Sequence, residues 1–166
     1  MTINTNVSAI LRITDQGLSL RKQFLRLTPE SVDALCQVAD YIESIAPDMV
    51  REFYNFQFGF SETAQFFARY ADRRGIPLST LRTRLEQAQL NYLLEIFREA
   101  KRGGRFDVDF FEKRLHIGYV HNEINLPMKW YIGSYAQMVE LLRKYLLQNE
   151  SLNPDLAKLA FQAIVS

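Results

Sequence analysis

The sequence has little of what disulfide-linked, zinc-bound or strand-rich proteins need. Its single cysteine, Cys36, excludes an intramolecular disulfide and a cysteine-based zinc site. Seven glycines and five prolines among 166 residues are too few for a β protein with many turns, or for a disordered chain. No apolar run approaches the ~20 residues needed to span a bilayer, and residues 1–6 lack the apolar stretch of a signal peptide. These absences favour a soluble, cytoplasmic domain without membrane insertion.

The chain also lacks an excess of either charge. Twenty Lys and Arg against 19 Asp and Glu give a formal net charge of +1. Nucleic-acid domains usually carry a basic excess, so this balance excludes a generic phosphate binder. With 166 residues, 48% of them hydrophobic, the chain is long enough for one domain that buries roughly two-thirds of its unfolded surface.

Apolar residues recur three and four positions apart through almost the whole sequence, which is the period of an α-helix. The clearest stripe contains Leu81, Leu85, Ala88, Gln89, Tyr92, Leu93 and Ile96. No segment alternates for long enough to indicate a strand. The sequence therefore predicts an all-α fold of about seven or eight helices.

Capping residues and breakers predict where these helices begin and end. We expect helices at residues 7–27; from Thr28-Pro29 to Pro47; from Pro47 onwards; a short aromatic one within an irregular stretch 59–77; from Ser79 or Thr80 to Gly103; from Asp107 or Asp109 to Pro127; at 128–148; and from Asn153-Pro154. Residues 1–27 would form an N-terminal helical extension and residues 28–166 the main domain. The last helix is still apolar at its end, which indicates truncation.

The chain contains two histidines, His116 and His121, on one predicted helix. A spacing of five separates them by roughly 140° on a helix, so a two-histidine metal site is not favoured. A lone histidine on an apolar face is more often a core side chain than a ligand. Gly118 adds a second signal, because glycine in mid-helix costs about 1 kcal/mol relative to alanine. Either a flat group lies over that turn, or another helix packs closely against it.

The run of residues 117–135 closely resembles the signature of the globin-coupled sensors, which are bacterial and archaeal haem domains attached to signalling outputs. The family's proximal histidine matches His121, and its Pro-x-x-Trp-Tyr run matches Pro127, Trp130 and Tyr131. The Phe-Tyr pair of the family's distal helix matches Phe53 and Tyr54, and a further distal pattern matches Leu85 and Tyr92. The resemblance covers about residues 28–166. One departure is Asn125, which stands where a glycine is common.

The resemblance implies a globin fold around haem b, with His121 as the proximal iron ligand. The other ring nitrogen of His121 should donate to a backbone carbonyl, which fixes the tautomer. His116 lies on the same helix and cannot reach the opposite face of the ring, so the sixth position stays open for O2, CO or NO. Tyr54 is the expected donor to the ligand. Gln89 is either a second donor or points to water.

Apolar side chains would complete the pocket. Leu81 and Leu85 would form its roof, and the other expected wall residues are Phe53, Tyr92, Ile117, Gly118, Ile124, Trp130 and Tyr131. Helix 128–148 is apolar over more than one face, so together with the final helix it is either a homodimer seam, including Leu142 and Tyr145, or a helix buried inside a monomer. We expect the basic clusters at 69–74 and 101–105 to form solvated surface rather than to reach haem propionates.

The function implied by this resemblance is an oxygen sensor domain that acts on an output region outside the chain. Two alternatives come from other classes. One is a haem-free, globin-like interaction module with His121 packed in the core. The other is a haem enzyme, but peroxidase chemistry needs a distal acid–base pair, usually His with Arg, and the chain has no spare histidine for it. We therefore expect a binding domain rather than an enzyme.

Overall fold

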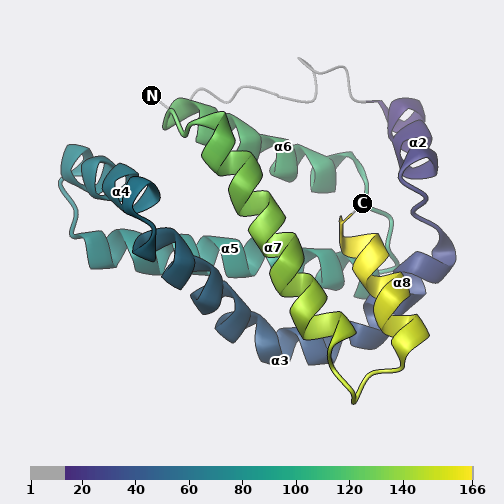
Figure 1. Ribbon diagram of the computed structural model, residues 1–166. Coiled ribbons are helices and arrows are strands. Elements are labelled where there is room, and N and C mark those ends of the chain that lie inside the picture. The colour runs from purple at the N-terminus through teal and green to yellow at the C-terminus, as the bar shows by residue number, and fades with distance from the viewer. Residues whose placement is uncertain (1–13, 166) are drawn as a thin grey trace.

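The computed structural model describes residues 14–165, and in this part of the chain it contains seven helices and no strand. The helices are α2 (Asp15–Phe24), α3 (Pro29–Gly59), α4 (Ser61–Arg74), α5 (Leu78–Lys101), α6 (Val108–Glu123), α7 (Met128–Leu147) and α8 (Pro154–Val165). Figure 1 shows their arrangement. The predicted all-α fold is confirmed. Of the predicted helix 7–27, the part before residue 14 lies outside the described residues.

Three helices begin at the capping residues that the sequence predicts. The Thr28 hydroxyl accepts a hydrogen bond from the Ser31 N–H at 3.3 Å at the start of α3. The Asp107 carboxylate accepts from the Phe110 N–H at 3.1 Å at the start of α6. The Asn153 side-chain oxygen accepts from two backbone N–H groups in the first turn of α8. Each cap satisfies donors that the first turn of a helix leaves free.

The predicted break at Pro47 is wrong, because α3 continues through this residue. Proline inside a helix removes one hydrogen bond and costs about 3 kcal/mol. The apolar residues on both sides of it are nevertheless fully buried, among them Ala46 and Met49. Burial of one continuous apolar face outweighs the local penalty. Pro47 itself points to solvent.

Two other predictions on helix ends are also wrong. The structure has a full helix, α4, where the sequence predicts an irregular stretch with only a short aromatic helix. Its end at Gly75 has a left-handed φ of 62°, a conformation that glycine adopts without strain. The next helix, α5, begins directly after Pro77, whose carbonyl already accepts from the Leu81 N–H at 3.1 Å, so neither Ser79 nor Thr80 caps it.

Helix α3 is the centre of the packing. It lies against α5 and α8 most extensively, and also against α4 and α7 (Figure 1). The largest fully buried side chains come from these helices: Leu35, Val38, Ile42, Met49, Val50, Phe97 and Leu146. Polar contacts join α3 to α7 as well, since the Tyr41 hydroxyl donates to the Tyr145 carbonyl at 2.8 Å and Lys144 pairs with Glu52 at 2.7 Å.

Helix α6 is attached much more loosely than α3, α4, α5, α7 and α8. It takes part in none of the main helix–helix contacts and lies on the opposite side of the molecule from α3 (Figure 1). Among its residues only Phe110 is fully buried, and Phe106 just before the helix is buried with it. The N-terminal end of α6 is therefore fixed in the core, while the part that carries His121 has little protein packed against it.

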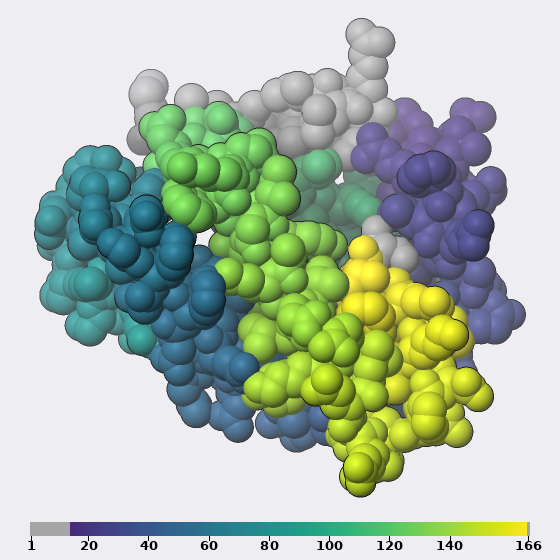
Figure 2. Space-filling model, viewed as in Figure 1, coloured from purple at the N-terminus to yellow at the C-terminus, as the bar shows by residue number. Residues whose placement is uncertain are grey.

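Helix α7 runs across one face of the molecule, so one of its sides is at the surface (Figure 2). Its exposed large apolar side chains are Met128, Tyr131, Ile132, Tyr135 and Leu147. Leu142, however, is buried in the core of the single chain, and the Tyr145 hydroxyl donates to Glu52 at 3.0 Å. The expectation that Leu142 belongs to a dimer seam is thus wrong, because this residue is already covered within one chain.

Candidate functional site

The ring of His121 is held in one orientation by its own helix. Its Nδ1 lies 2.8 Å from the backbone carbonyl oxygen of Ile117. A carbonyl can only accept, so Nδ1 must carry the proton and donate it. In the neutral imidazole this leaves Nε2 with a free lone pair, which is the form that ligates a metal. The sequence predicts this contact for the second ring nitrogen.

The backbone at His121 is fixed by the turn that ends α6. The Leu126 N–H donates to the His121 carbonyl at 3.1 Å, and the Asn125 N–H donates to the Asn122 carbonyl at 2.9 Å. This pair of bonds places Asn125 at a left-handed φ of 54°. Asparagine tolerates that conformation better than other non-glycine residues. The departure from glycine at this position therefore leaves the turn intact.

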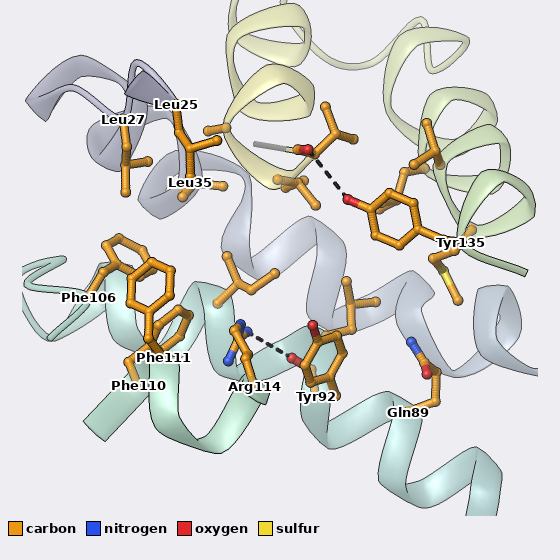
Figure 3. A pocket seen from close by; sticks show the side chains of 18 residues that line it. Leu25, Leu27, Leu35, Gln89, Tyr92, Phe106, Phe110, Phe111, Arg114 and Tyr135 are labelled. Atoms are coloured by element: carbon orange, nitrogen blue, oxygen red, sulfur yellow. Dashed lines mark hydrogen bonds between the residues drawn. The ribbon is translucent and has the colours of Figure 1, made fainter. Parts of the chain in front are cut away.

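A cavity of about 230 Å³ is lined by residues of α3, α5, α6, α7 and α8 and of the connections between α2 and α3 and between α5 and α6 (Figure 3). Its lining is mostly apolar and consists of Leu25, Leu27, Leu35, Gln89, Tyr92, Leu93, Ile96, Phe106, Phe110, Phe111, Arg114, Tyr135, Met138, Val139, Leu142, Ala163, Ile164 and Val165. The Tyr135 hydroxyl reaches the Val165 carbonyl at 3.4 Å across the cavity wall. An apolar cavity with a few convergent polar groups is the usual form of a cofactor site.

Tyrosines connect this cavity to His121. The ring of Tyr131 lies 4.8 Å from the ring of His121, between their centroids. Burial raises the pKa of Tyr92; Arg114 opposes this, while Tyr131 and Tyr135 raise it further. These electrostatic effects on the pKa of Tyr92 require Arg114, Tyr131 and Tyr135 to lie near the Tyr92 side chain. Of the predicted site residues, Gln89 and Tyr92 line the cavity, whereas His121 and Tyr131 are not among its lining residues.

The cavity is smaller than the roughly 300–1,000 Å³ of most ligand sites, so a porphyrin needs it to widen. The weak attachment of α6 provides for that movement, since displacing this helix disrupts few contacts. The exposed apolar side chains Val120, Tyr131 and Tyr135 on α6 and α7 would gain cover from an apolar ring. The free Nε2, the apolar lining and the loosely held helix together fit a haem.

The residues predicted for the distal side lie on α3 and α5. Phe53, Tyr54 and Leu81 are buried, Leu85 packs against the core, and none of the four lines the cavity. Burial raises the pKa of the Tyr54 phenol, and Glu86 raises it further. Within the described part of the chain this hydroxyl makes no hydrogen bond, while every fully buried side-chain nitrogen or oxygen there has a partner. The Tyr54 hydroxyl oxygen is therefore not completely enclosed by protein atoms.

The remaining predicted residues are at the surface or only half-buried. Trp130 packs edge-on against Phe60, with ring centroids 5.4 Å apart, and Ile124 is half-buried at the end of α6. A Cβ placed on Gly118 would meet nothing within 4 Å. Close helix–helix contact at Gly118 is thus excluded for the described residues, and the hypothesis of a flat group over that turn remains. His116 is exposed beside Tyr119.

The sequence analysis missed several cavity residues, of which Arg114 is the most informative. It precedes His121 by seven residues, which is close to two helical turns, so the two side chains share a face. That spacing was available in the sequence. The basic clusters, in contrast, lie as expected: Arg69, Arg73, Arg74 and Arg105 are exposed, and Lys101 pairs with Asp40 and Glu43.

The described residues form the all-helical fold expected of a globin-type domain. The family model for protoglobin matches residues 14–165, and the chain belongs to the protoglobin family. No curated protein and no solved structure matches it. Membership confirms the resemblance to sensor globins and gives a haem-binding domain, a fold that binds ligands and is not an enzyme by itself. No helix of the described residues has the length and apolar character to cross a bilayer.

Proposed function

We propose that this domain is a cytoplasmic gas sensor that holds haem b through His121 and reversibly binds O2 at the open position opposite. The observation that carries the proposal is the hydrogen bond from His121 Nδ1 to the Ile117 carbonyl. That bond orients the ring and leaves Nε2 as the one free nitrogen of the side chain. Haem would supply the iron to which the diatomic ligand binds.

Tyr54 would act on the ligand as a hydrogen-bond donor. Its raised pKa keeps the phenol protonated at any physiological pH, and its oxygen has no competing partner within the described chain. O2 polarises more strongly than CO on ferrous iron, so a donor favours O2. Gln89 is the second polar group proposed for this side. Leu81 and Leu85 would limit the entry of water.

Signal transfer would begin at α6 and pass through the turn before α7. Because α6 has few contacts of its own, a small shift of His121 moves the helix at little cost, whereas α7 is packed against α3 and α8. The turn that ends at Pro127 joins α6 to α7, and the Tyr131 N–H in the first turn of α7 donates to the Pro127 carbonyl. The proposed output region and a homodimer partner would then respond at the surface formed by α7 and α8, where Ile132 and Leu147 are exposed.

The first test is haem binding by His121→Ala, with His116→Ala as the matched control on the same helix. The wild type and His116→Ala should bind one haem and give a five-coordinate ferrous spectrum that changes on aeration. His121→Ala should lose stoichiometric haem. Full retention of haem by His121→Ala contradicts the ligand assignment. A colourless wild-type protein after reconstitution would instead identify a haem-free interaction module.

The second test separates O2 from CO. Tyr54→Phe should release O2 about ten- to a hundred-fold faster, since a hydrogen bond to a charged acceptor is worth ~1.5–3 kcal/mol. Release of CO should change much less. Tyr70→Phe is the control. It also removes a phenol hydroxyl, but from a tyrosine of α4 whose ring contacts Arg74 and which is not proposed to contact the gas. Equal effects of Tyr54→Phe on both gases would contradict a donor role.

A further inference from the structure

Arg114 is a half-buried cation in the wall of the apolar cavity (Figure 3). Its guanidinium carbon lies 3.7 Å from the centre of the Phe110 ring and 4.7 Å from that of Tyr92. One of its nitrogens donates to the Tyr92 backbone carbonyl at 3.2 Å. These contacts hold the planar group against α5 at the cavity wall.

The partners of Arg114 do not neutralise its charge. No carboxylate in the described part of the chain lies within ion-pair distance of it. The acid that influences it most is Glu95, which already pairs with Arg102 at 3.2 Å. A guanidinium stays protonated, and even partial removal from water is unfavourable unless an anion compensates the charge. The carbonyl and the two rings compensate it only in part.

Arg114 is also the one cation among the described residues that line the cavity. The other basic residues near this end of the molecule, Lys101, Arg102 and Arg105, are exposed to solvent. An anionic group that enters the cavity therefore meets a single, well-oriented fork of donors. Arginine binds carboxylates in this way through two parallel hydrogen bonds.

We propose that Arg114 binds a propionate carboxylate of the haem. This inference rests on the proposed function, in which His121 holds the iron. Arg114 and His121 lie on the same face of α6 and about 10 Å apart along its axis. Haem carries its only carboxylates at the edge of the ring, away from the iron. One helix thus offers an imidazole for the centre of the cofactor and a guanidinium for its rim.

The test compares haem with haem dimethyl ester, in which both carboxylates are blocked. Wild type, Arg114→Met, Arg114→Lys and Arg84→Met are loaded with each compound, and its transfer to excess apomyoglobin is timed at pH 7. Arg84 is exposed on α5 and serves as the control. Wild type and Arg84→Met should lose the ester about ten- to a hundred-fold faster than haem.

Arg114→Met should lose haem nearly as fast as the wild type loses the ester, and should distinguish the two compounds little. Arg114→Lys should lie between. If Arg114→Met distinguishes them as strongly as the wild type does, the inference is wrong, even where overall release is faster through poorer packing. Five-coordinate spectra of the loaded proteins distinguish a wrong assignment of Arg114 from a wrong proposed function. If the proposed function is wrong, neither the wild type nor any variant binds haem.

Discussion

The core around α3 and the region around α6 use similar residues with different results. In α3, Val38, Ile42, Ala46 and Met49 are all 0% exposed. Helix α6 also carries apolar residues, but they are not gathered on one face as in α3; only Phe110 is buried, and Val120 is 42% exposed. The chain completes the first region by itself. The second has the pattern expected where a ligand supplies part of the core.

This difference has a consequence for stability. Elements with few buried apolar contacts open locally at a lower free energy than the molecule as a whole. We expect α6 to open in the haem-free protein while α3, α5 and α8 stay folded. Haem would join the two regions into one cooperative unit, because ligand binding to the folded form stabilises it. Substitutions in each region test which helices unfold together with α3 and which unfold with α6.

The largest expected effect is that of Phe97→Ala in α5. Phe97 is fully buried, and truncating such a side chain costs about 3–5 kcal/mol. The matched change in the other region, Ile117→Ala, removes a half-buried side chain and should cost about 1 kcal/mol or less. Urea unfolding of the haem-free protein measures both. Phe97→Leu is used if Phe97→Ala does not fold. Equal losses of stability at Phe97 and Ile117 would show that the region around α6 is packed as tightly as the core around α3.

The helix caps offer a second comparison, since a side-chain oxygen accepts one backbone hydrogen bond at the start of each helix. Thr28 caps α3 and Asp107 caps α6, each through one side-chain hydrogen bond. Thr28→Ala should lower the global free energy of unfolding by about 1 kcal/mol. Asp107→Ala should leave the global value nearly unchanged and speed hydrogen exchange only in α6. If Asp107→Ala lowers global stability as much as Thr28→Ala, α6 unfolds together with the core.

How much of this could be predicted depended on whether the signal was local. Thr28, Asp107 and Asn153 are caps that act within one turn, and the helix starts that they predict are confirmed. The family membership followed from a run of contiguous residues around His121. Pro47 fails as a local signal, because the burial of α3 against α5 and α8 decides its conformation.

The cavity could not be predicted because its lining is assembled from five helices and the connections between α2 and α3 and between α5 and α6. Tyr135 and Leu142 belong to the same apolar helix, but only the packing of α7 on α3 and α8 shows that Leu142 is internal. The free hydroxyl of Tyr54 and the weak attachment of α6 likewise have no sequence signal. His121 as the ligand and Tyr54 as the donor remain predictions, which the haem and gas experiments test.

A smaller effect is expected at Gly118. Replacing it with alanine should stabilise the haem-free protein by about 0.5–1 kcal/mol, because alanine favours the helix and the added methyl meets nothing within 4 Å. With haem bound, the gain should vanish if the ring lies over that turn. Gly133→Ala in α7 also meets nothing and should give the same gain in both forms. An undiminished gain at Gly118 in the haem-bound protein would exclude a flat group there.

The smallest effect concerns the polar contacts between α3 and α7. Hydrogen bonds from Lys144 lower the pKa of Glu52, and the Tyr145 hydroxyl contributes. A carboxylate with a lowered pKa in the folded state stabilises above its unfolded pKa and loses this contribution as pH falls through the folded value. Because Glu52 is partly exposed, Glu52→Gln should cost only a few tenths of a kcal/mol at pH 7.

That loss should vanish once the pH falls below the lowered pKa of Glu52 and should shrink in 1 M salt, where charges are screened. Glu140→Gln is the control, because Glu140 pairs with Arg143 within α7 and joins no second helix. It should change stability less than Glu52→Gln does. A pH-independent cost at Glu52 would show that the side chain stabilises the contact between α3 and α7 through packing rather than through its charge.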